Sequence, residues 1–325
     1  MNAYKIDVPV LLIFFNRPEP FSKVFEQVKI ARPSKLFLYQ DGVRKDKPND
    51  ERLVMECRRI AEDIDWECEV QRFYQTENKG CDPSEFIAIK WAFSQVDKCI
   101  VLEDDDVPSQ SFFPFCKELL ERYEYDQRIN MICGMNTSEI SDNISSSYSF
   151  SRCSTIWGWA SWKRVIDEWD GTYSFLDDKE SMTLLKDNLD HNYHVAFDDL
   201  FNYAKRHRQS GREHYESILA FNRNLNSRLN IIPKYNLISN IGVQSESTHT
   251  VADIRMFSRS VQKLYKLRTF DLEFPLTHPK HVIENYQHAK NHMDLLAINR
   301  PFRKFLRGIE MKCRVILYKH ILRNK

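Results

Sequence analysis

The sequence contains few glycines and none of the glycine-rich phosphate-binding motifs. Its 325 residues include only eight glycines, and neither GxGxxG nor GxxxxGK[ST] occurs. Because these motifs hold phosphates with backbone amides at a helix N-terminus, their absence argues against a dinucleotide dehydrogenase and a P-loop NTPase. If phosphates bind to this chain, side chains and a metal ion must hold them.

Long hydrophobic runs, a signal peptide and paired cysteines are also missing. No stretch approaches the roughly 20 apolar residues that span a membrane, and residues 1–7 lack the charged-then-apolar build of a signal peptide. The eight cysteines show no CxxC spacing, which predicts reduced core residues rather than zinc ligands or disulfides. The net charge of +1 gives no indication of nucleic acid binding. We therefore expect a cytoplasmic protein without a nucleic acid partner.

Strands and helices alternate along the first 140 residues. Apolar runs predict strands at 8–15, 35–40, 68–74, 99–103 and 130–133. Helical spacing of apolar residues predicts helices at 20–31, 53–64, 83–95 and 111–125. This alternation predicts a mostly parallel sheet with helices on both faces, and ligands of such sheets bind at the carboxyl ends of the strands.

After residue 138 the pattern changes without a linker. Residues 141–151 are serine-rich and turn-like, and three tryptophans follow within 156–162. Helical segments are expected at 163–226, a short strand at 229–232, and a loop region at 236–250. Because no linker separates the halves, the second half is expected to complete one domain.

The run Ile100-Val101-Leu102-Glu103-Asp104-Asp105-Asp106 places four carboxylates at the end of an apolar strand. Oxygen ligands are the preferred ligands of Mg²⁺ and Mn²⁺, which keep other positions for water and substrate phosphates. The alternative is a solvated acidic turn that caps the next helix. The run therefore predicts a divalent metal site, with that alternative open.

The other strand ends carry polar loops. They are Asn16-Arg17, Asp41-Gly42 and Asn78-Lys79-Gly80, and with the acidic run they converge on one edge of the predicted sheet. Asp41 is a hypothetical acceptor for a base N–H or a ribose hydroxyl, although Asp-Gly is also an ordinary turn. Arg17, Lys79 and Arg72 are the candidate cations for a diphosphate.

Further candidates lie in the second half. Aromatic faces pack on sugar rings, so Trp157 and Trp159, on either side of Gly158, are candidates for a sugar site; core packing is the alternative. Glu216, in a predicted helix shortly before the strand that ends at Pro233, is a candidate general base. Asp198 and Asp199 compete with it for that role, and a solvated helix surface is the ordinary alternative.

The C-terminal end is basic and amphipathic. Residues 300–325 hold nine Lys or Arg against one acid, with apolar residues at helical spacing. Such a helix lies on an anionic membrane surface, docks on another helix, or packs its apolar face on the body of the protein.

These motifs together resemble bacterial nucleotide-sugar transferases of the GT-A fold, in the motif order of N-acetylglucosaminyltransferase I. The matching segments are 8–18, 39–42, 78–81, 101–105, 156–164 and 236–250. The resemblance implies a Rossmann-like GT-A domain over 1–250, with a nucleotide-binding half at 1–138 and an acceptor half at 139–250. A C-terminal helical extension follows at 251–325.

The resemblance also implies roles for residues. Asp105 matches the direct Mn²⁺ or Mg²⁺ ligand, Glu103 and Asp104 lie nearer the donor, and the additional Asp106 leaves an alternative register open. Trp157-Gly158-Trp159 matches a loop next to donor sugar and acceptor. Glu216, 17 residues before Pro233, matches the catalytic carboxylate, and His249 is a candidate for the diphosphate or metal.

The function implied is an inverting transfer of a hexosyl or N-acetylhexosaminyl group. The donor is a nucleotide-diphosphate sugar, with UDP expected, and the acceptor is a hydroxyl of a glycan or of a lipid-linked molecule at the inner membrane face. Synthesis of surface polysaccharide or glycoconjugate is the expected setting. The alternatives are a sugar nucleotidyltransferase and a non-catalytic sugar-binding protein of the same fold.

Overall fold

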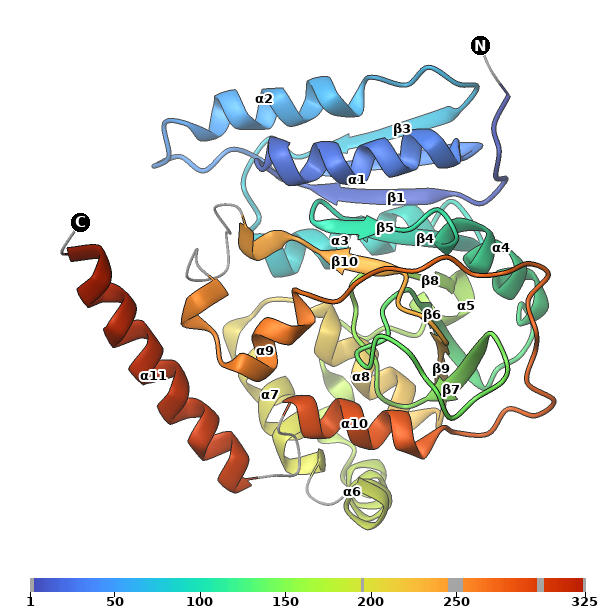
Figure 1. Ribbon diagram of the computed structural model, residues 1–325, viewed down its shortest axis with the longest axis vertical. Helices are drawn as coiled ribbons and strands as arrows, with labels where there is room; N and C mark the ends of the chain where they lie inside the picture. The colour runs from blue at the N-terminus through green and yellow to red at the C-terminus, as the bar shows by residue number, and fades with distance from the viewer. Residues whose placement is uncertain (1–2, 194–195, 245–253, 297–300, 324–325) are drawn as a thin grey trace.

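The computed structural model describes residues 3–193, 196–244, 254–296 and 301–323 (Figure 1). Its strands are β1 (Val10–Phe14), β2 (Lys35–Gln40), β3 (Glu69–Tyr74), β4 (Lys98–Glu103), β5 (Asp106–Pro108), β6 (Ile129–Cys133), β7 (Tyr148–Ser151), β8 (Trp159–Trp162), β9 (Leu229–Pro233) and β10 (Ile238–Asn240). Within the described ranges, eight of these strands form one sheet in the order β3-β2-β1-β4-β8-β6-β9-β7. The two remaining strands, β10 and β5, pair with each other.

Helices cover both faces of this sheet. They are α1 (Pro18–Ala31), α2 (Asp50–Ala61), α3 (Cys81–Phe93), α4 (Phe112–Arg122), α5 (Lys163–Ile166), α6 (Lys179–Tyr193), α7 (Ala196–Ser210), α8 (Tyr215–Leu225), α9 (Arg259–Leu264), α10 (Tyr286–Leu296) and α11 (Pro301–Arg323). Alternate side chains of β1 enter different cores: Leu12 packs with α1, α2 and α4, whereas Leu11 packs with α3, α5 and α8. The predicted α/β class, with a mostly parallel sheet between helical layers, is confirmed.

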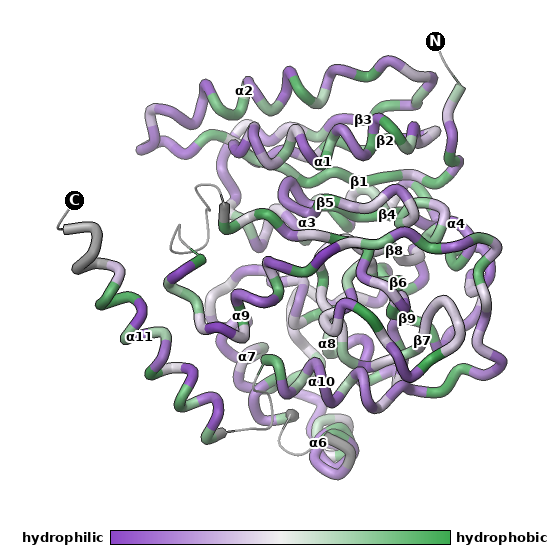
Figure 2. The backbone as a smooth tube through the Cα atoms, viewed as in Figure 1, coloured by the Kyte–Doolittle hydropathy of each residue, from purple (hydrophilic) through white to green (hydrophobic). Residues whose placement is uncertain are grey.

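The four N-terminal strands are parallel, as the alternation of strands and helices predicts. β1 pairs with β2 on one side and with β4 on the other, both in parallel. The strand order runs outward from β1 through β2 to β3 and resumes with β4 on the other side of β1, which makes the carboxyl ends of β1 and β4 a topological switch point. Figure 2 shows the corresponding hydrophobic colour along β1.

The second half differs from the sequence prediction in three places. The tryptophan segment is a strand, β8, which pairs antiparallel with both β4 and β6 in the middle of the sheet. The serine-rich segment contains β7, an edge strand on β9, and the expected loop after Pro233 contains β10. These strands are only three or four residues long and pair with distant segments, so local sequence patterns do not identify them.

The C-terminal segment lies outside the sheet. α9 and α10 contact each other, and α10 also contacts β7. α11 runs along one side of the molecule, where it contacts the short turn Ile254–Met256 (Figure 1). Among the described residues, no helix combines the length and the hydrophobicity that crossing a membrane requires. All eight cysteines are free, and Cys57, Cys99, Cys116 and Cys133 are buried.

Candidate active site

A cavity of about 450 Å³ opens at the switch point of the sheet. It is lined by the residues that follow β1, β2 and β4, by the first turn of α3, and by Asn240 and Gly242 after β10. Its volume is in the range of sites for small ligands. Segments that are distant in the sequence thus meet at the carboxyl ends of the strands, where ligands of such sheets bind.

The acidic run after β4 forms one wall of the cavity. Arg17 lies opposite, because α1 begins directly after it, and its guanidinium donates to Asp104 and pairs with Asp105 at 2.9 Å. Burial alone would lower the pKa of Arg17, but the charges of Asp104 and Asp105 raise it above its ordinary value. Burial raises the pKa of Asp105, against the effect of Arg17. Two carboxylates at the cavity are therefore held by one internal cation.

Asp106 faces away from the cavity. Its side chain is fully buried and accepts hydrogen bonds from the Gly158 amide at 2.8 Å and from the Asn240 side chain at 3.1 Å. Asp106 also begins β5, opposite Asn240 of β10. Its position favours a structural role that joins the tryptophan segment and β10, and it leaves Asp105 as the better candidate for the metal.

Gly242 allows the chain after β10 to approach Asp105 closely. A Cβ at Gly242 would lie 2.1 Å from Asp105 Oδ2, closer than any real contact. The approach is fixed by the Ile241 amide, which donates to the Asp105 carbonyl at 2.9 Å, and by Asn240, which donates to Asp105 Oδ1 at 2.9 Å. One oxygen of Asp105 is thus oriented by Asn240 and the other meets Arg17.

Asp41 organises the opposite wall. Its carboxylate accepts from the amides of Gly42 and Lys79 at 2.8 Å and of Gly80 at 3.0 Å, and from the Asn78 side chain at 2.8 Å. Gly42 is required here, because a Cβ would lie 2.3 Å from the backbone of Glu77. Both Asp41 and Asn78 line the cavity, so Asp41 shapes the pocket by holding the loop after β3.

Two further acids lie at the base of the cavity. Glu85 of α3 and Glu103 of β4 are both among its lining residues. Burial, followed by the charge of Glu216, raises the pKa of Glu85 well above its usual value; burial, followed by the charge of Glu85, does the same for Glu103. The hydroxyl of Tyr215, the first residue of α8, donates to Glu103 at 3.3 Å. These shifted pKa values are typical of active sites, although they also occur in structural networks.

The start of α8 places a second group of polar side chains near Glu85 and Glu103. Ligand atoms of Asp82, His214 and Glu216 all lie within 4.8 Å of one another. His214 Nδ1 is 3.1 Å from Asp82, which lines the cavity, and the ring of His214 stacks on His207. Glu216 is therefore next to the cavity wall, in reach of the same carboxylate–histidine pair.

The tryptophan segment contributes one aromatic side chain to the cavity. Trp157 lines it together with Tyr265, and the two ring centroids are 5.0 Å apart. Trp159 instead lies in the core, 1% exposed, where it stacks against Phe93 and Tyr215. Of the two tryptophans expected at a sugar, the structure brings only Trp157 to the site.

Several predicted residues lie elsewhere. Arg72, on the edge strand β3, makes a bidentate pair with Glu62. Asn16 donates to Asp50, the first residue of α2. Lys79 contributes its amide, while its ammonium lies 3.7 Å from Glu77. Since none of these three side chains lines the cavity, their expected contact with the donor lacks support.

Both competing aspartates are on α7, away from the cavity. Asp198 pairs with Lys186 at 2.9 Å, and Asp199 pairs with Lys304 of α11 at 2.8 Å. Their positions correspond to the solvated helix surface that was the alternative interpretation. His249 lies outside the described residues.

Sequence reasoning missed five residues at this site: Asp82, Glu85, His214, Arg44 and Arg212. Asp82 and Glu85 sit on the first turns of α3, so they would be found by extending the strand-end rule into the following helix. His214 and Arg212 come from the turn before α8, more than 100 residues away, and no local pattern marks them.

The donor set fits a hard divalent cation. Asp104 and Asp105 present carboxylate oxygens at the cavity, and the close backbone at Gly242 leaves no space for a side chain beside Asp105. Oxygen ligands with open positions for phosphate suit Mg²⁺ or Mn²⁺. Arg17 supplies the compensating charge in the structure as it stands.

Comparison with known proteins adds little to the site. No family model and no curated protein sequence matches the chain. Among solved structures, an apo UDP-glucose pyrophosphorylase is 10% identical, covering 72% of this chain and 93% of its own, with a TM-score of 0.34. A UDP-glucose pyrophosphorylase complexed with UDP-glucose is 14% identical, covering 45% and 62%, with a TM-score of 0.25. The 4-diphosphocytidyl-2C-methyl-D-erythritol synthase of Anaerococcus prevotii DSM 20548 is 10% identical, covering 49% and 73%, with a TM-score of 0.30. At these scores the likeness carries no residue role and no activity over to this chain.

Proposed function

We propose that this protein is a metal-dependent enzyme that transfers a sugar from a nucleotide-diphosphate sugar to a hydroxyl of a glycan or lipid-linked acceptor. One observation carries the proposal: Asp104 and Asp105 face the loop held by Asp41 across a single cavity at the switch point. In open α/β sheets this is where nucleotides bind. A UDP-sugar is the donor we expect.

In this proposal, different residues of the cavity contact different parts of the donor. The Asp41-anchored loop, with Asn78, is the surface for the nucleoside. Arg17 and Arg212 are the cations placed to meet the diphosphate. Trp157 offers an aromatic face to the sugar.

Asp105, with Asp104 beside it, is the proposed holder of Mn²⁺ or Mg²⁺. When bound, such an ion offsets the negative charge that builds on the leaving diphosphate. Arg17 neutralises these carboxylates in the structure, and in this proposal its guanidinium turns to the phosphates when the donor binds.

Glu216 is the proposed general base. It would take the proton of the acceptor hydroxyl as that oxygen attacks the anomeric carbon from the face opposite the diphosphate, which inverts the configuration. Its position beside Asp82, at the cavity wall, supports this role over Asp198 and Asp199. A Glu216→Gln variant keeps the shape of the side chain and cannot accept the proton.

Sugar nucleotidyl transfer is the second candidate, and the solved structures named above include two UDP-glucose pyrophosphorylases. It uses a different second substrate: pyrophosphate attacks the nucleotide sugar and gives a nucleoside triphosphate and a sugar 1-phosphate, whereas glycosyl transfer or hydrolysis releases a nucleoside diphosphate. A non-catalytic sugar-binding protein would bind the donor and release neither.

The experiment is a screen of nucleotide sugars with Mn²⁺, either alone, with an acceptor extract or with added pyrophosphate, in which nucleoside diphosphate and nucleoside triphosphate are measured separately. We expect nucleoside diphosphate release, reduced at least 100-fold in Asp105→Asn and in Glu216→Gln. Asp199→Asn, on the surface of α7, is the matched control and should keep full activity. Pyrophosphate exchange without sugar transfer would reject glycosyl transfer, and unchanged release in both active-site variants would reject the site.

We also propose that α11 lies on an anionic membrane surface, where a lipid-linked acceptor would be found. The helix turns its polar side to the body: Lys304 pairs with Asp199, and Glu310 accepts from the amide of Arg259. Its apolar side is exposed, including Phe302 at 71% and Phe305 at 64%. A helix that packs on its own protein shows the opposite arrangement.

Liposome co-sedimentation tests this contact. Vesicles with anionic lipid should retain the protein, and the double variant Phe302→Ser, Phe305→Ser should bind at least about tenfold more weakly, because each buried ring contributes about 1.5–3 kcal/mol. The control, Tyr125→Ser with Leu184→Ser, removes two exposed apolar side chains elsewhere. Equal retention of all three proteins would contradict the proposal.

A further inference from the structure

A second cavity, of about 680 Å³, lies among the helices of the second half. Its walls come from α6, α7, α8, α9, α10, the start of α11 and the two residues after β7, and it shares no lining residue with the first cavity. Its volume also falls in the range of ligand sites. The nucleotide-sugar site described above makes no use of it.

Most of the wall is apolar. The side chains that form it are Leu189, Leu200, Val261, Met293 and Leu296. They come from four different helices, so the apolar surface is built by the tertiary fold and not by one helix face. A surface of this kind accepts a hydrocarbon chain, and burying the chain is favourable by about 0.8 kcal/mol per CH₂.

One arginine reaches this cavity without a partner. Arg223 of α8 lines it, and its Nε is buried with no hydrogen-bond partner. Among the described residues, no acid lies within ion-pair distance of its guanidinium, and burial lowers its pKa. An unpaired buried charge is costly, which makes this side chain unusual.

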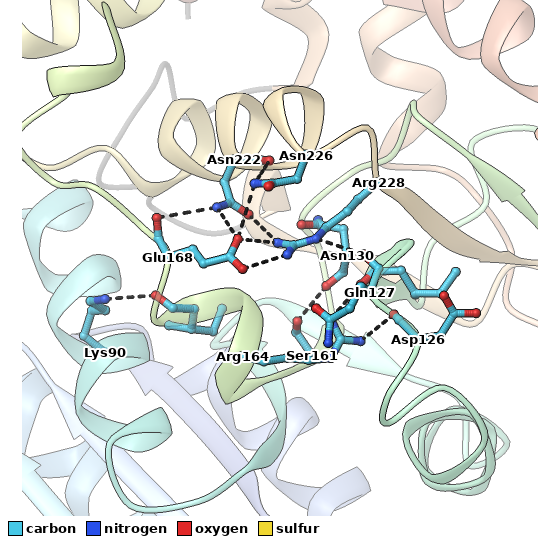
Figure 3. A network of polar contacts seen from close by, with 12 residues as sticks. Lys90, Asp126, Gln127, Asn130, Ser161, Arg164, Glu168, Asn222, Asn226 and Arg228 are labelled. Atoms are coloured by element: carbon cyan, nitrogen blue, oxygen red, sulfur yellow. Dashed lines mark hydrogen bonds and ion pairs between the residues drawn. The ribbon is translucent and has the colours of Figure 1, made fainter. Parts of the chain in front are cut away.

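Arg228, just beyond the end of the same helix, shows how the protein pairs such a group elsewhere. Its guanidinium binds Glu168 at 2.6 and 2.7 Å, and Asn222 accepts from it at 3.1 Å (Figure 3). This network fixes the C-terminal end of α8. The contrast indicates that Arg223 is available to a partner that the polypeptide does not supply.

Other cations surround the same space. Arg206 of α7 and Arg307 of α11 line the cavity, and no acid of the described chain pairs with either. The acid at the rim, Asp199, is already paired with Lys304. The cavity is therefore apolar with an excess of positive charge, which complements an anion attached to a hydrocarbon.

We propose that this cavity binds a single-chain amphiphile with a phosphate head, the phosphate on Arg223 and the chain along the wall formed by Leu200 and Met293. Phosphate and guanidinium match as charge-assisted hydrogen-bonding partners. The site does not depend on the proposed nucleotide-sugar activity. It does share α8 with it, since this helix carries Glu216 in its first turn and Arg223 two turns later.

The probe is dodecyl phosphate, kept below its micelle concentration and measured by isothermal titration calorimetry with the full chain. We expect saturable binding to one site, at least tenfold weaker in Arg223→Gln and partly retained in Arg223→Lys. Arg59→Gln, which removes an exposed arginine of α2, is the control for overall charge and should bind like the wild type. The Phe302→Ser, Phe305→Ser variant should also bind normally, which separates the cavity from the exposed face of α11.

Two comparison ligands separate the contribution of the phosphate head from that of the hydrocarbon chain. Inorganic phosphate and dodecyl maltoside should each bind at least tenfold more weakly than dodecyl phosphate. If either binds as tightly, the proposal of an anionic amphiphile is overturned. The same conclusion follows if Arg223→Gln binds dodecyl phosphate like the wild type.

The stability of the ligand-free variant is a second readout. Removing a buried, unpaired charge should leave the melting temperature of Arg223→Gln equal to or above that of the wild type. The wild type alone should then melt higher when dodecyl phosphate is added. A clear loss of stability in the ligand-free variant would show that Arg223 serves the fold and would overturn the proposal.

Discussion

Both carboxylate oxygens of Asp41 accept hydrogen bonds from the loop after β3. Asp41→Ala would leave the amides of Lys79 and Gly80 without their acceptor and should reduce the free energy of unfolding by about 3 kcal/mol. Because the same loop forms the wall for the nucleoside, affinity for UDP should fall as well. Urea unfolding and a UDP titration measure the two effects.

Asp46→Ala is the matched control, since Asp46 follows the same strand and is exposed. It should change neither quantity. If Asp41→Ala were as stable as this control, the hydrogen bonds to the loop would not be what holds it.

At Gly242 only the hydrogen atom of a glycine fits beside Asp105. In Gly242→Ala the added Cβ would have to displace Asp105, whose Oδ2 it would approach to 2.1 Å. We expect at least tenfold weaker binding of UDP with Mn²⁺, a smaller effect on UDP alone, and a melting temperature within a few degrees of the wild type. Gly308→Ala, where nothing lies within 4 Å of the new Cβ, is the control. Unchanged Mn²⁺-dependent binding would argue against Asp105 as the metal ligand.

At the scale of elements, α10 is held against the core by two buried histidines. Burial lowers the pKa of His288 to about 4 and, together with the charge of His288, that of His292 to about 3. The folded protein therefore keeps these rings neutral, whereas the unfolded chain protonates them near pH 6.5. Their contribution is unperturbed above pH 6.5, and stability is lost as the pH falls from there towards 4.

His292→Gln tests this dependence. At pH 5 the wild type should lose about 2 kcal/mol more than the variant, relative to pH 7.5, in urea unfolding. His281→Gln, which changes an exposed histidine, should follow the wild type. Parallel pH profiles for all three proteins would show that His292 does not titrate with unfolding.

The sequence predicts those strands and helices that show a pattern over neighbouring residues. The strand at 35–40 agrees with β2, and those at 68–74 and 99–103 agree with β3 and β4 to one residue. β2 and β4 are buried parallel strands with apolar runs, whereas β3 is a partly exposed edge strand. The family resemblance implies a loop at Trp157-Gly158-Trp159, but Trp159–Trp162 forms β8, because pairing with β4 and β6 gives this segment its strand character.

The same distinction applies to the candidate site. The ends of strands can be recognised in the sequence, which therefore predicts Arg17, Asp41, Asp104 and Asp105 at one edge of the sheet. All four residues line one cavity. Glu85 lines it from α3, the helix that follows β3, whereas His214 meets the lining residue Asp82 only through the packing of α3 and α8, which no spacing in the sequence encodes. Asp198 illustrates the reverse: a promising local motif that the fold leaves on a surface.

At the scale of the whole molecule, one sheet joins both halves of the chain. β8 and β9 come from the second half and pair with β4 and β6 of the first. A fragment of residues 1–138 would expose Leu11 and Val101, which pack in the core on the α3 side together with Trp159 and Tyr215. The two halves should therefore not fold separately.

We expect the 1–138 fragment to bind the dye ANS and to lack a cooperative thermal transition, while the full chain unfolds in a cooperative transition. Circular dichroism in the near ultraviolet provides the measurement. A fragment with native-like aromatic signals and a sharp transition would show that the first half is an independent domain.

The central position of β8 also has a consequence for synthesis of the chain. β4 is complete at Glu103, but its neighbour β8 is complete only at Trp162, about 60 residues later. At about 5–20 residues per second, a ribosome needs roughly 3–12 s to make that segment. During this interval the nascent chain carries an unpaired apolar strand edge, the kind of edge that associates with other chains. Production of this protein should therefore be sensitive to translation speed and to the supply of chaperones that cover such edges.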